Sequence, residues 1–137
     1  MNATARQIGS SLRHEVDVNG RHTILTDEPA SLGGTDSGPA PHELLPATLA
    51  SCVSTMVAMY ANNRGWDIGE TEVSVDYDPD TVPRALTVEL RLPAGLSDEQ
   101  IGRLERVAAT CPVRRALEAG FAIQERVLIT GETSAAA

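Results

Sequence analysis

Lysine is absent from this sequence, and all eleven basic residues are arginines. Without lysine there is no Schiff-base chemistry, no lysine-bound pyridoxal phosphate and no Walker lysine to hold a nucleotide phosphate. Acidic residues outnumber basic ones by 19 to 11, which gives a net charge of −8. That charge repels polyphosphates, so nucleic acid and anionic membrane surfaces are disfavoured as partners.

Aromatic residues are also scarce, with one Trp, two Tyr and one Phe in 137 residues. The hydrophobic fraction of 42% is ordinary for a folded domain, so the core has to be built mainly from Leu, Val and Ala. No linker or repeat divides the chain, and residues 1–137 are predicted to form a single domain. A chain of this size with so few large side chains is expected to need a partner to bury enough apolar surface.

No charged residue occurs between Leu44 and Asn63, so this stretch has to be considered as a membrane span. Pro46 and several Ser, Thr and Asn residues make it too polar to face lipid, and it is interpreted as a helix buried inside protein. The first residues lack the apolar run of a secretion signal, and a cytoplasmic location is expected. In that reducing compartment Cys52 and Cys111 are not expected to form a permanent disulfide.

The strand signals come in pairs rather than alternating with helices. Short strands are predicted at residues 3–8, 12–18, 21–26, 71–78, 85–92 and 121–129. Asn19-Gly20 is a strong signal for a type I′ hairpin turn between the second and third of these strands. Hairpins of this kind indicate the α+β class with a mostly antiparallel sheet.

Three helices are predicted between and after the strands. The first begins near His42–Glu43, because Pro46 is tolerated only within a first turn. The second follows the capping box Ser97–Gln100 and presents one apolar face that ends at Cys111. A short third helix covers Val113–Ala119, and residues 134–137 are expected to fray.

Several common functional sites are missing from the sequence. The glycine-rich loop Gly33–Gly38 lacks the spacing of a nucleotide-binding fingerprint. His14, His22 and His42 are scattered, and neither CxxC nor HExxH occurs, so no metal site is expected. No GxSxG elbow supports a serine hydrolase. No cofactor is predicted.

The two cysteines are the residues most suited to chemistry. Cys52 lies in the middle of the apolar helix, where a lone cysteine is most often a small buried hydrophobe. Cys111 ends the apolar face of the second helix and directly precedes Pro112, so its sulfur can lie at the N-terminus of the third helix, where thiolates are favoured. Two inward-facing cysteines suggest a redox pair, and the spacing alone leaves both interpretations open.

Three runs of residues resemble one known family. They are Asp27-Glu28-Pro29 with Gly33-Gly34-Thr35-Asp36-Ser37-Gly38-Pro39, then Pro41-His42-Glu43-Leu44-Leu45 leading to Leu49-Ala50-Ser51-Cys52, and finally Cys111-Pro112-Val113 with Arg115. With Met59-Tyr60-Ala61 and Arg64-Gly65-Trp66 they resemble the OsmC/Ohr superfamily of osmotically inducible and organic-hydroperoxide-resistance proteins, in its OsmC-like branch. The resemblance spans roughly residues 20–130.

This resemblance implies an OsmC-like fold with two main helices and an intertwined homodimer in which each central helix packs against the partner. It also implies thiol peroxidase chemistry, with Cys52 as the peroxidatic cysteine and Cys111 as the resolving one. An arginine and a glutamate complete the site in the family, and Arg13 and Glu43 are the candidates for these roles here. Arg115 is the second candidate for the arginine.

The sequence departs from the family pattern at these helper residues. His42 stands directly after the motif proline, where the family glutamate is usual, and Glu43 comes one residue later. One residue turns a side chain by about 100° around a helix. The turn Gly9–Arg13 offers Arg13, although the strict alignment can fall on Ser11, and Arg114 stands where the family often has a histidine.

The function expected from the resemblance is reduction of organic hydroperoxides, and of hydrogen peroxide, by a two-cysteine cycle in oxidative-stress defence. An external dithiol, which the resemblance suggests is of the lipoyl type, would restore both thiols. The alternative is a non-catalytic dimeric binding module that keeps the fold and the buried thiols. Thiol transfer without peroxide is disfavoured because CxxC is absent.

Overall fold

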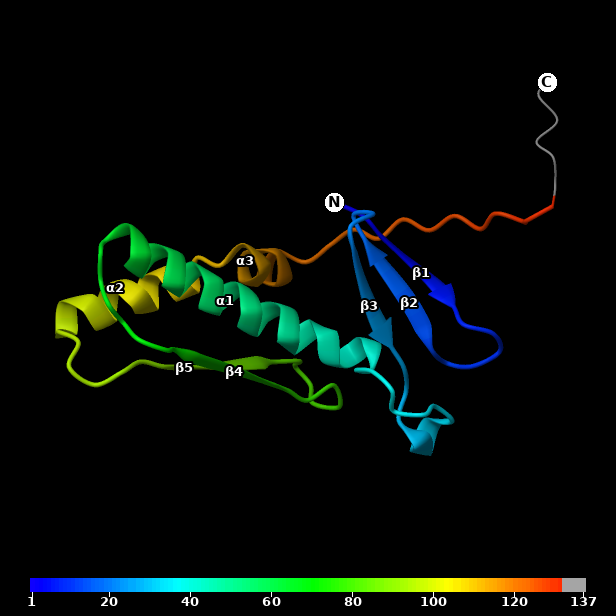
Figure 1. The fold of residues 1–137 in the computed structure, drawn as a ribbon, viewed down its shortest axis with the longest axis horizontal. Coiled ribbons are helices and arrows are strands. Elements are labelled where there is room, and N and C mark those ends of the chain that lie inside the picture. Colours follow the sequence, from blue (N-terminus) through cyan, green and yellow to red (C-terminus); the bar gives the residue numbers. More distant parts are fainter. Residues whose placement is uncertain (132–137) are drawn as a thin grey trace, which may run out of the picture.

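The computed structural model describes residues 1–131 and arranges them in two regions (Figure 1). The N-terminal region, residues 1–40, holds a three-stranded sheet and a long loop, and the helical region, residues 41–119, holds the main helices and a two-stranded sheet. Residues 120–131 leave the last helix as an extended segment. The residues predicted to fray, 134–137, lie outside the described part of the chain.

The N-terminal sheet is antiparallel throughout. Its strands, in spatial order, are β1 (Ala3–Gln7), β2 (His14–Val18) and β3 (His22–Thr26). Asn19 and Gly20 both have positive φ, at 54° and 66°, as the predicted turn requires, and the N–H of Arg21 donates to the carbonyl of Val18 at 3.2 Å. The hairpin prediction is therefore confirmed.

The central helix begins where the prolines predict. A 3₁₀ turn, η2 (Pro41–Glu43), leads into α1 (Leu44–Asn63), and another short 3₁₀ helix, η1 (Ala30–Leu32), lies in the loop before it. Pro46 falls in the first turn of α1, where its missing N–H has no partner to lose. The N-terminal region thus delivers the chain into a helix of 20 residues.

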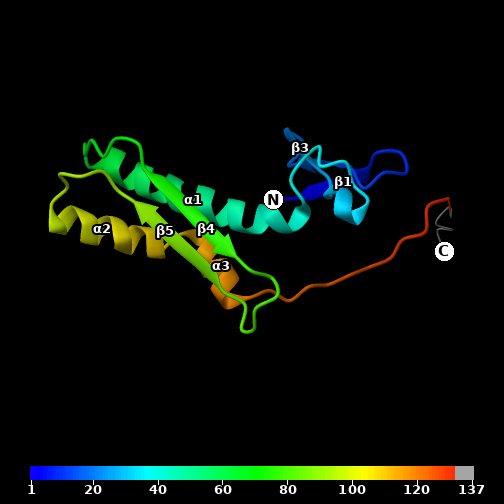
Figure 2. The ribbon, with the colours of Figure 1, turned by 90° about the horizontal axis from the view of Figure 1, so that it is seen from below.

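The rest of the helical region packs around α1. It consists of β4 (Glu72–Tyr77), β5 (Leu86–Arg91), α2 (Asp98–Ala109) and α3 (Pro112–Ala119). The hairpin of β4 and β5 lies across one side of α1, and α2 runs beside α1 (Figure 2). Ser97 and Gln100 form the predicted capping box at the start of α2. The α+β class is confirmed, with the strands divided between two antiparallel sheets.

The core consists of two apolar clusters along α1. The cluster near the C-terminal end of α1 is built on Val57, Ala61, Ile68 and Leu104. The cluster in its N-terminal half is built on Leu49, Val53 and Cys111. Both clusters belong to the helical region, while the fully buried residues of the N-terminal region are Thr26 and Asp27.

Within one chain, only one side of α1 is covered, and the prediction that a second chain covers the rest of this helix stays a prediction. The buried residues Leu49, Val53, Val57 and Ala61 follow a single stripe. On the other side Ser51, Thr55 and Met59 are exposed. With its preceding turn, Pro41–Asn63 is long and apolar enough to cross a membrane: its apolar 18-residue stretch has a mean hydropathy of 1.5 and is 22% buried.

The predicted last strand, residues 121–129, is not a strand in this structure. All of its residues are exposed, and Figure 2 shows the segment running clear of both sheets. Its large apolar side chains are 66–89% exposed: Phe121, Ile123, Val127, Leu128 and Ile129. A strand needs a sheet edge with which to exchange hydrogen bonds, and within residues 1–131 this segment lies against none.

Candidate active site

The fold brings the two cysteines together from distant parts of the sequence. Cys52 comes from the middle of α1, and Cys111 is the residue on which α3 begins. Cys111 is fully buried, Cys52 is half-buried, and both are free thiols. They share one cluster with apolar side chains of α1, α3 and the second hairpin, among them Leu49, Met56, Val88 and Leu117.

The surroundings of Cys52 favour the neutral thiol. Burial raises the pKa of Cys52, and the thiol of Cys111 beside it raises that pKa further. The backbone N–H of Val113, in the first turn of α3, acts in the opposite direction because an amide donor stabilises a thiolate. Within one chain the effect of burial is larger than that of this donor, and the pKa of Cys52 is raised.

Glu43 does not lie beside the cysteines. Its carboxylate accepts a hydrogen bond from the N–H of Ala40 at 2.9 Å and so caps the turn that starts the helix. Nine residues of helix separate it from Cys52, a rise of about 13 Å. In a single chain Glu43 is therefore a capping residue and is not in contact with the thiol pair.

Arg13 also lies apart from the thiol pair of its own chain. It belongs to the turn between β1 and β2, which lies at the far end of the N-terminal sheet from α3 (Figures 1 and 2). Its side chain is half-buried. Within residues 1–131, the Nε of Arg13 is the one buried side-chain nitrogen that lacks a hydrogen-bond partner. A buried donor of this kind normally has an acceptor.

A groove that the sequence did not reveal adjoins the thiol cluster. It has a volume of about 860 Å³, within the usual range for ligand sites. Its apolar walls include Leu49, Leu86 and Leu117, which also pack around the cysteines. Arg84 and Arg114 stand at its rim, and Arg114 is paired with Glu118 at 2.9 Å. Arg115, the second candidate for the arginine, is exposed on α3 and is not among the lining residues.

Metal chemistry finds no support in the part of the chain that the structure describes. No group of three or more His, Cys, Asp or Glu side chains is arranged there to hold a metal ion. The chemistry that the site can perform with its own groups is that of two adjacent thiols, which can be oxidised to one disulfide.

A second buried group, Asp27, organises the loop ahead of α1. Its carboxylate accepts hydrogen bonds from the N–H of Glu28 (2.9 Å), from the N–H and hydroxyl of Thr35 (3.0 and 2.6 Å) and from the N–H and hydroxyl of Ser37 (3.1 and 2.9 Å). These donors, with the Thr35 hydroxyl first, hold the pKa of Asp27 well below its usual range against the opposing effect of burial. Sequence reasoning took Asp27 as part of a loop and missed this role; its signal was an Asp followed by Thr and Ser donors.

The geometry defines a class of protein: an α+β fold in which a central helix carries a thiol that meets a second thiol at the start of a short helix. Comparison with known proteins gives the family. The OsmC-like protein family matches residues 34–126, and the chain belongs to this family. No curated protein sequence matches the chain.

Solved structures share the fold. An OsmC-like protein of Mycoplasma pneumoniae superposes with a TM-score of 0.69 at 18% identity, covering 85% of this chain and 86% of that one. An organic hydroperoxide resistance protein OsmC of Legionella pneumophila gives 0.56 at 20% identity, covering 85% and 89%. An organic hydroperoxide resistance protein of Elizabethkingia anophelis gives 0.57 at 23% identity, covering 84% and 86%. At these identities the likeness establishes the fold.

Proposed function

We propose that this protein is a thiol-dependent peroxidase that reduces organic hydroperoxides through Cys52 and Cys111. The observation that carries the proposal is the meeting of these two thiols in one apolar cluster beside a groove. Membership of the OsmC-like family and the likeness to proteins named for organic hydroperoxide resistance support it.

In the proposed cycle the Cys52 thiolate attacks the distal oxygen of the hydroperoxide ROOH. The O–O bond breaks, the alkoxide leaves with a proton as the alcohol ROH, and Cys52 becomes a sulfenic acid. The Cys111 thiol then displaces water from that sulfenic acid and forms the Cys52–Cys111 disulfide. Two electrons from an external dithiol, proposed to be of the lipoyl type, restore both thiols by exchange.

The apolar groove favours organic hydroperoxides over hydrogen peroxide. Leu49, Leu86 and Leu117 offer a carbon chain a surface that hydrogen peroxide cannot use. Because these side chains also pack around the cysteines, a bound chain would bring its peroxide group toward the sulfur from the groove side. A cytoplasmic location stays a prediction.

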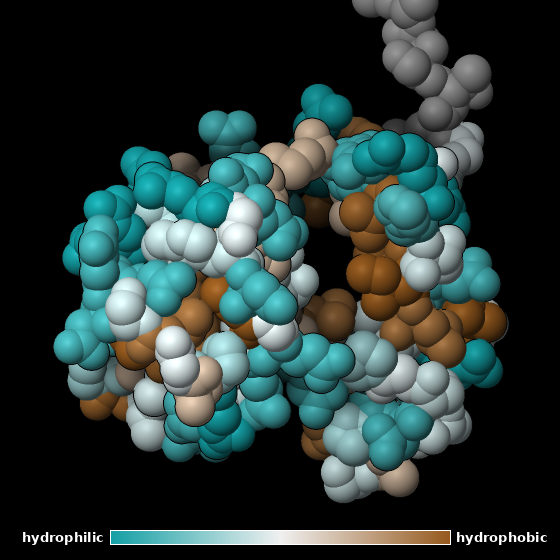
Figure 3. All heavy atoms as spheres, turned by 60° about the vertical axis from the view of Figure 1, so that its left-hand side comes forward, coloured by the Kyte–Doolittle hydropathy of each residue, from teal (hydrophilic) through white to brown (hydrophobic). Residues whose placement is uncertain are grey.

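We further propose that the working form is a homodimer wrapped around α1. The chain exposes 10447 Å² of surface, whereas a compact monomer of its mass exposes about 6900 Å². This excess is large enough for one partner's share of an obligate interface. Figure 3 shows an opening in the molecule with apolar surface along one edge, and we propose that a second chain fills it.

Two surfaces would be covered in such a dimer. One is the exposed side of α1, where the small side chains of Ser51 and Thr55 allow close approach of another helix and Met59 adds apolar surface. The other is the apolar segment 121–129, which could form the predicted strand by pairing with a sheet edge of the second copy. Removal of residues 121–137 should then lower the association of the chains, measured by sedimentation at equal concentrations. An unchanged dimer would contradict this assignment of the segment.

The partner would also complete the site. Cys52 lies next to the exposed side of α1, and Arg13 has a buried donor with no acceptor in its own chain. We propose that Arg13 of the partner subunit supplies the positive charge that stabilises the thiolate and the developing charge on the peroxide oxygen. Glu43 of either chain could orient that arginine once the chains are assembled.

Steady-state assays with cumene hydroperoxide and a dithiol test the function. Cys52→Ser should abolish turnover, because no thiolate remains to attack the peroxide. Cys111→Ser is the matched control: it should complete one reduction and then stop with an oxidised Cys52. In the wild type a pulse of hydroperoxide should remove two mass units as the disulfide forms. Equal turnover by wild type and Cys52→Ser would disprove the mechanism.

The second candidate function is a non-catalytic dimeric binding module. The observation in its favour is the raised pKa of Cys52, which leaves little thiolate near neutral pH within one chain. In that case Cys52 would resist alkylation at pH 7, and hydroperoxide would not be consumed. Rapid alkylation at pH 7 together with peroxide consumption would eliminate this candidate.

A further inference from the structure

A second cavity lies between the last turns of α1 and the C-terminal half of α2, and it shares no lining residue with the groove beside the thiols. It has a volume of about 190 Å³ and is lined by Tyr60, Arg103, Arg106, Val107 and Thr110. Since one water occupies about 30 Å³ in the liquid, the cavity has room for a compact group of a few heavy atoms with some water. Two of its five lining residues carry a positive charge.

The electrostatics of this cavity are opposite to those of the whole chain. Arg64 stands over the ring of Tyr60, with its guanidinium carbon 4.8 Å from the ring centre. Arg103 and Arg106 line the cavity itself, and Glu99 is the carboxylate paired with Arg103. Three positive groups against one negative group leave a local excess of positive charge in a protein whose net charge is −8.

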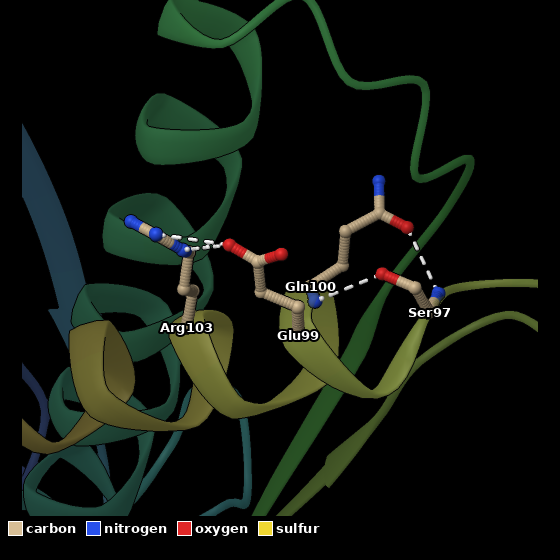
Figure 4. A network of polar contacts seen from close by, with 4 residues as sticks. All are labelled: Ser97, Glu99, Gln100 and Arg103. Carbon is tan, nitrogen blue, oxygen red and sulfur yellow. Dashed lines mark hydrogen bonds and ion pairs between the residues drawn. The ribbon is translucent and has the colours of Figure 1, made fainter.

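The Arg103 side chain is held in place by its partners. Glu99 accepts from both Nε and Nη2 of Arg103, at 3.1 and 2.9 Å, and Figure 4 shows its carboxylate directed at the guanidinium. Tyr60 is a further hydrogen-bond partner of this guanidinium, which still has N–H groups left for another acceptor. Tyr60 and Glu99 together raise the pKa of Arg103 above its usual value. Fixed guanidinium donors of this kind are what a bound oxyanion requires.

Arg106 contributes a second donor group without a carboxylate of its own. One of its terminal nitrogens, Nη1, lies 3.6 Å from the place where a side chain on Gly102 would begin, so the guanidinium folds back along α2 toward the turn that carries Arg103. Across residues 1–131, no Asp or Glu forms an ion pair with Arg106. Two positive groups on one cavity repel each other, and a bound anion would relieve that repulsion.

Tyr60 gives the cavity a rigid wall. Its ring meets that of Trp66 edge to face, at 5.8 Å between ring centres and 75° between planes. The Thr110 hydroxyl donates to the carbonyl of Val107 at 2.8 Å, and its oxygen remains at the cavity edge. The next residue after Thr110 is Cys111, so the cavity adjoins the segment that leads to the second thiol.

We propose that this cavity binds a compact oxyanion, a carboxylate or a phosphate group, between Arg103 and Arg106. The oxyanion accepts from N–H groups of both guanidinium groups, and Tyr60 lines one side. This site does not depend on the peroxidase proposal, because it uses none of the thiol chemistry.

The single tryptophan of the chain makes the proposal measurable, since Trp66 touches Tyr60. The full chain is titrated with inorganic phosphate, and separately with succinate, at constant ionic strength while Trp66 fluorescence is recorded. Saturable binding in the millimolar range or tighter is expected, and Arg106→Gln should weaken it at least tenfold. Arg106 is exposed, so this variant should keep the fold.

Arg21→Gln is the matched control, because Arg21 is exposed on the N-terminal hairpin far from the cavity. It should bind as the wild type does. Saturation by both anions assigns the site to oxyanions in general, and saturation by one of them assigns it to that group. No saturation up to tens of millimolar by either anion would overturn the proposal, as would equal affinity of the wild type and Arg106→Gln.

Discussion

The N-terminal region and the helical region each contain a titratable group whose pKa is shifted by its surroundings, and the two shifts favour opposite charge states. Asp27 is surrounded by donors, which lower its pKa and keep it charged. Cys52 lies among apolar side chains, which raise its pKa and keep it neutral. The first arrangement stabilises a loop at any ordinary pH, whereas the second needs another charged group before the thiol can react.

The two regions also differ in what holds them together. The helical region has two apolar clusters built by α1, α2 and the β4–β5 hairpin. The N-terminal region has one hydrogen-bonded carboxylate and a sheet whose strand residues are mostly half-buried or exposed. Stability within one chain should therefore come from apolar packing in one region and from local hydrogen bonds in the other.

The largest effect is expected in the core of the helical region. Leu104 is fully buried, and Leu104→Ala should lower the free energy of unfolding by about 2–5 kcal/mol through lost burial and a cavity. Ile24→Ala in β3, at 38% exposure, should cost less than about 1 kcal/mol. Urea denaturation measures both. If Ile24→Ala lowers the free energy of unfolding as much as Leu104→Ala does, the two regions do not differ in this way, and the N-terminal sheet also carries a core.

A smaller effect is expected where the N-terminal loop is tightest. A side chain on Gly34 would overlap the backbone of Glu28, and Gly34→Ala should destabilise by about 1–3 kcal/mol. Gly102, inside α2, is the control: a methyl group there meets only the end of Arg106 at 3.6 Å. Gly102→Ala should stabilise by about 0.5–1 kcal/mol because alanine favours a helix. If both variants unfold at the same midpoint as the wild type, the loop is not tightly packed.

Loss of a single hydrogen bond to Asp27 should have an effect of similar size. Thr35→Val removes the hydroxyl donor at 2.6 Å and should cost about 1.5–3 kcal/mol at neutral pH, the range for bonds to a charged group. Its control is Thr81→Val, because the Thr81 hydroxyl bonds only a backbone carbonyl in an exposed turn.

The stability that the Asp27–Thr35 hydrogen bond contributes should depend on pH in a definite direction. The folded pKa of Asp27 is depressed, so its contribution to stability is present above the ordinary carboxyl pKa near 3.8 and is lost as the pH falls through the folded value. Wild type should therefore lose stability more steeply than Thr35→Val between pH 5 and pH 2. Parallel acid denaturation curves would show that Thr35 does not hold the carboxylate charged.

Replacement of Arg13 should shift the pH at which the Cys52 thiol is alkylated. With Arg13→Gln, burial and the neighbouring Cys111 thiol keep the pKa of Cys52 raised, and its alkylation by iodoacetamide should require a higher pH than that of a free thiol. In the wild type the partner's arginine should move the alkylation midpoint down. Arg6→Gln, an exposed change on β1, should behave as the wild type. Identical profiles for wild type and Arg13→Gln would remove Arg13 from the site.

The raised pKa of Cys52 also makes the stability of the protein depend on pH. A thiol whose folded pKa is raised contributes stability below its unfolded pKa and loses it as the pH rises through the folded value. Arg13→Gln should thus be more sensitive to alkaline denaturation than the wild type. The measurement is a thermal midpoint at increasing pH, with Cys52→Ser as the variant in which the difference disappears.

The elements with strong local signals were predictable from the sequence. Asn19-Gly20 specified its turn because both residues tolerate positive φ, and Pro46 set the start of α1 because proline fits only a first turn. Ser97 and Gln100 specified the start of α2 by capping it. The pairing of Cys52 with Cys111 was suggested by their inward faces and by resemblance to a family, and the fold brings the two together.

Other features depend on contacts between distant residues, and no local pattern contains them. Residues 121–129 are predicted as a strand, but a strand forms only where an edge is available, and one chain supplies none in the part described. Glu43 and Arg13 were assigned to the site by motif, whereas tertiary structure placed one in a cap and the other at the end of the N-terminal sheet. The five donors around Asp27 and the arginine cavity on α2 arise from folding of the loop and packing of two helices. Sequence determines propensity and periodicity, and only packing decides which side chains meet.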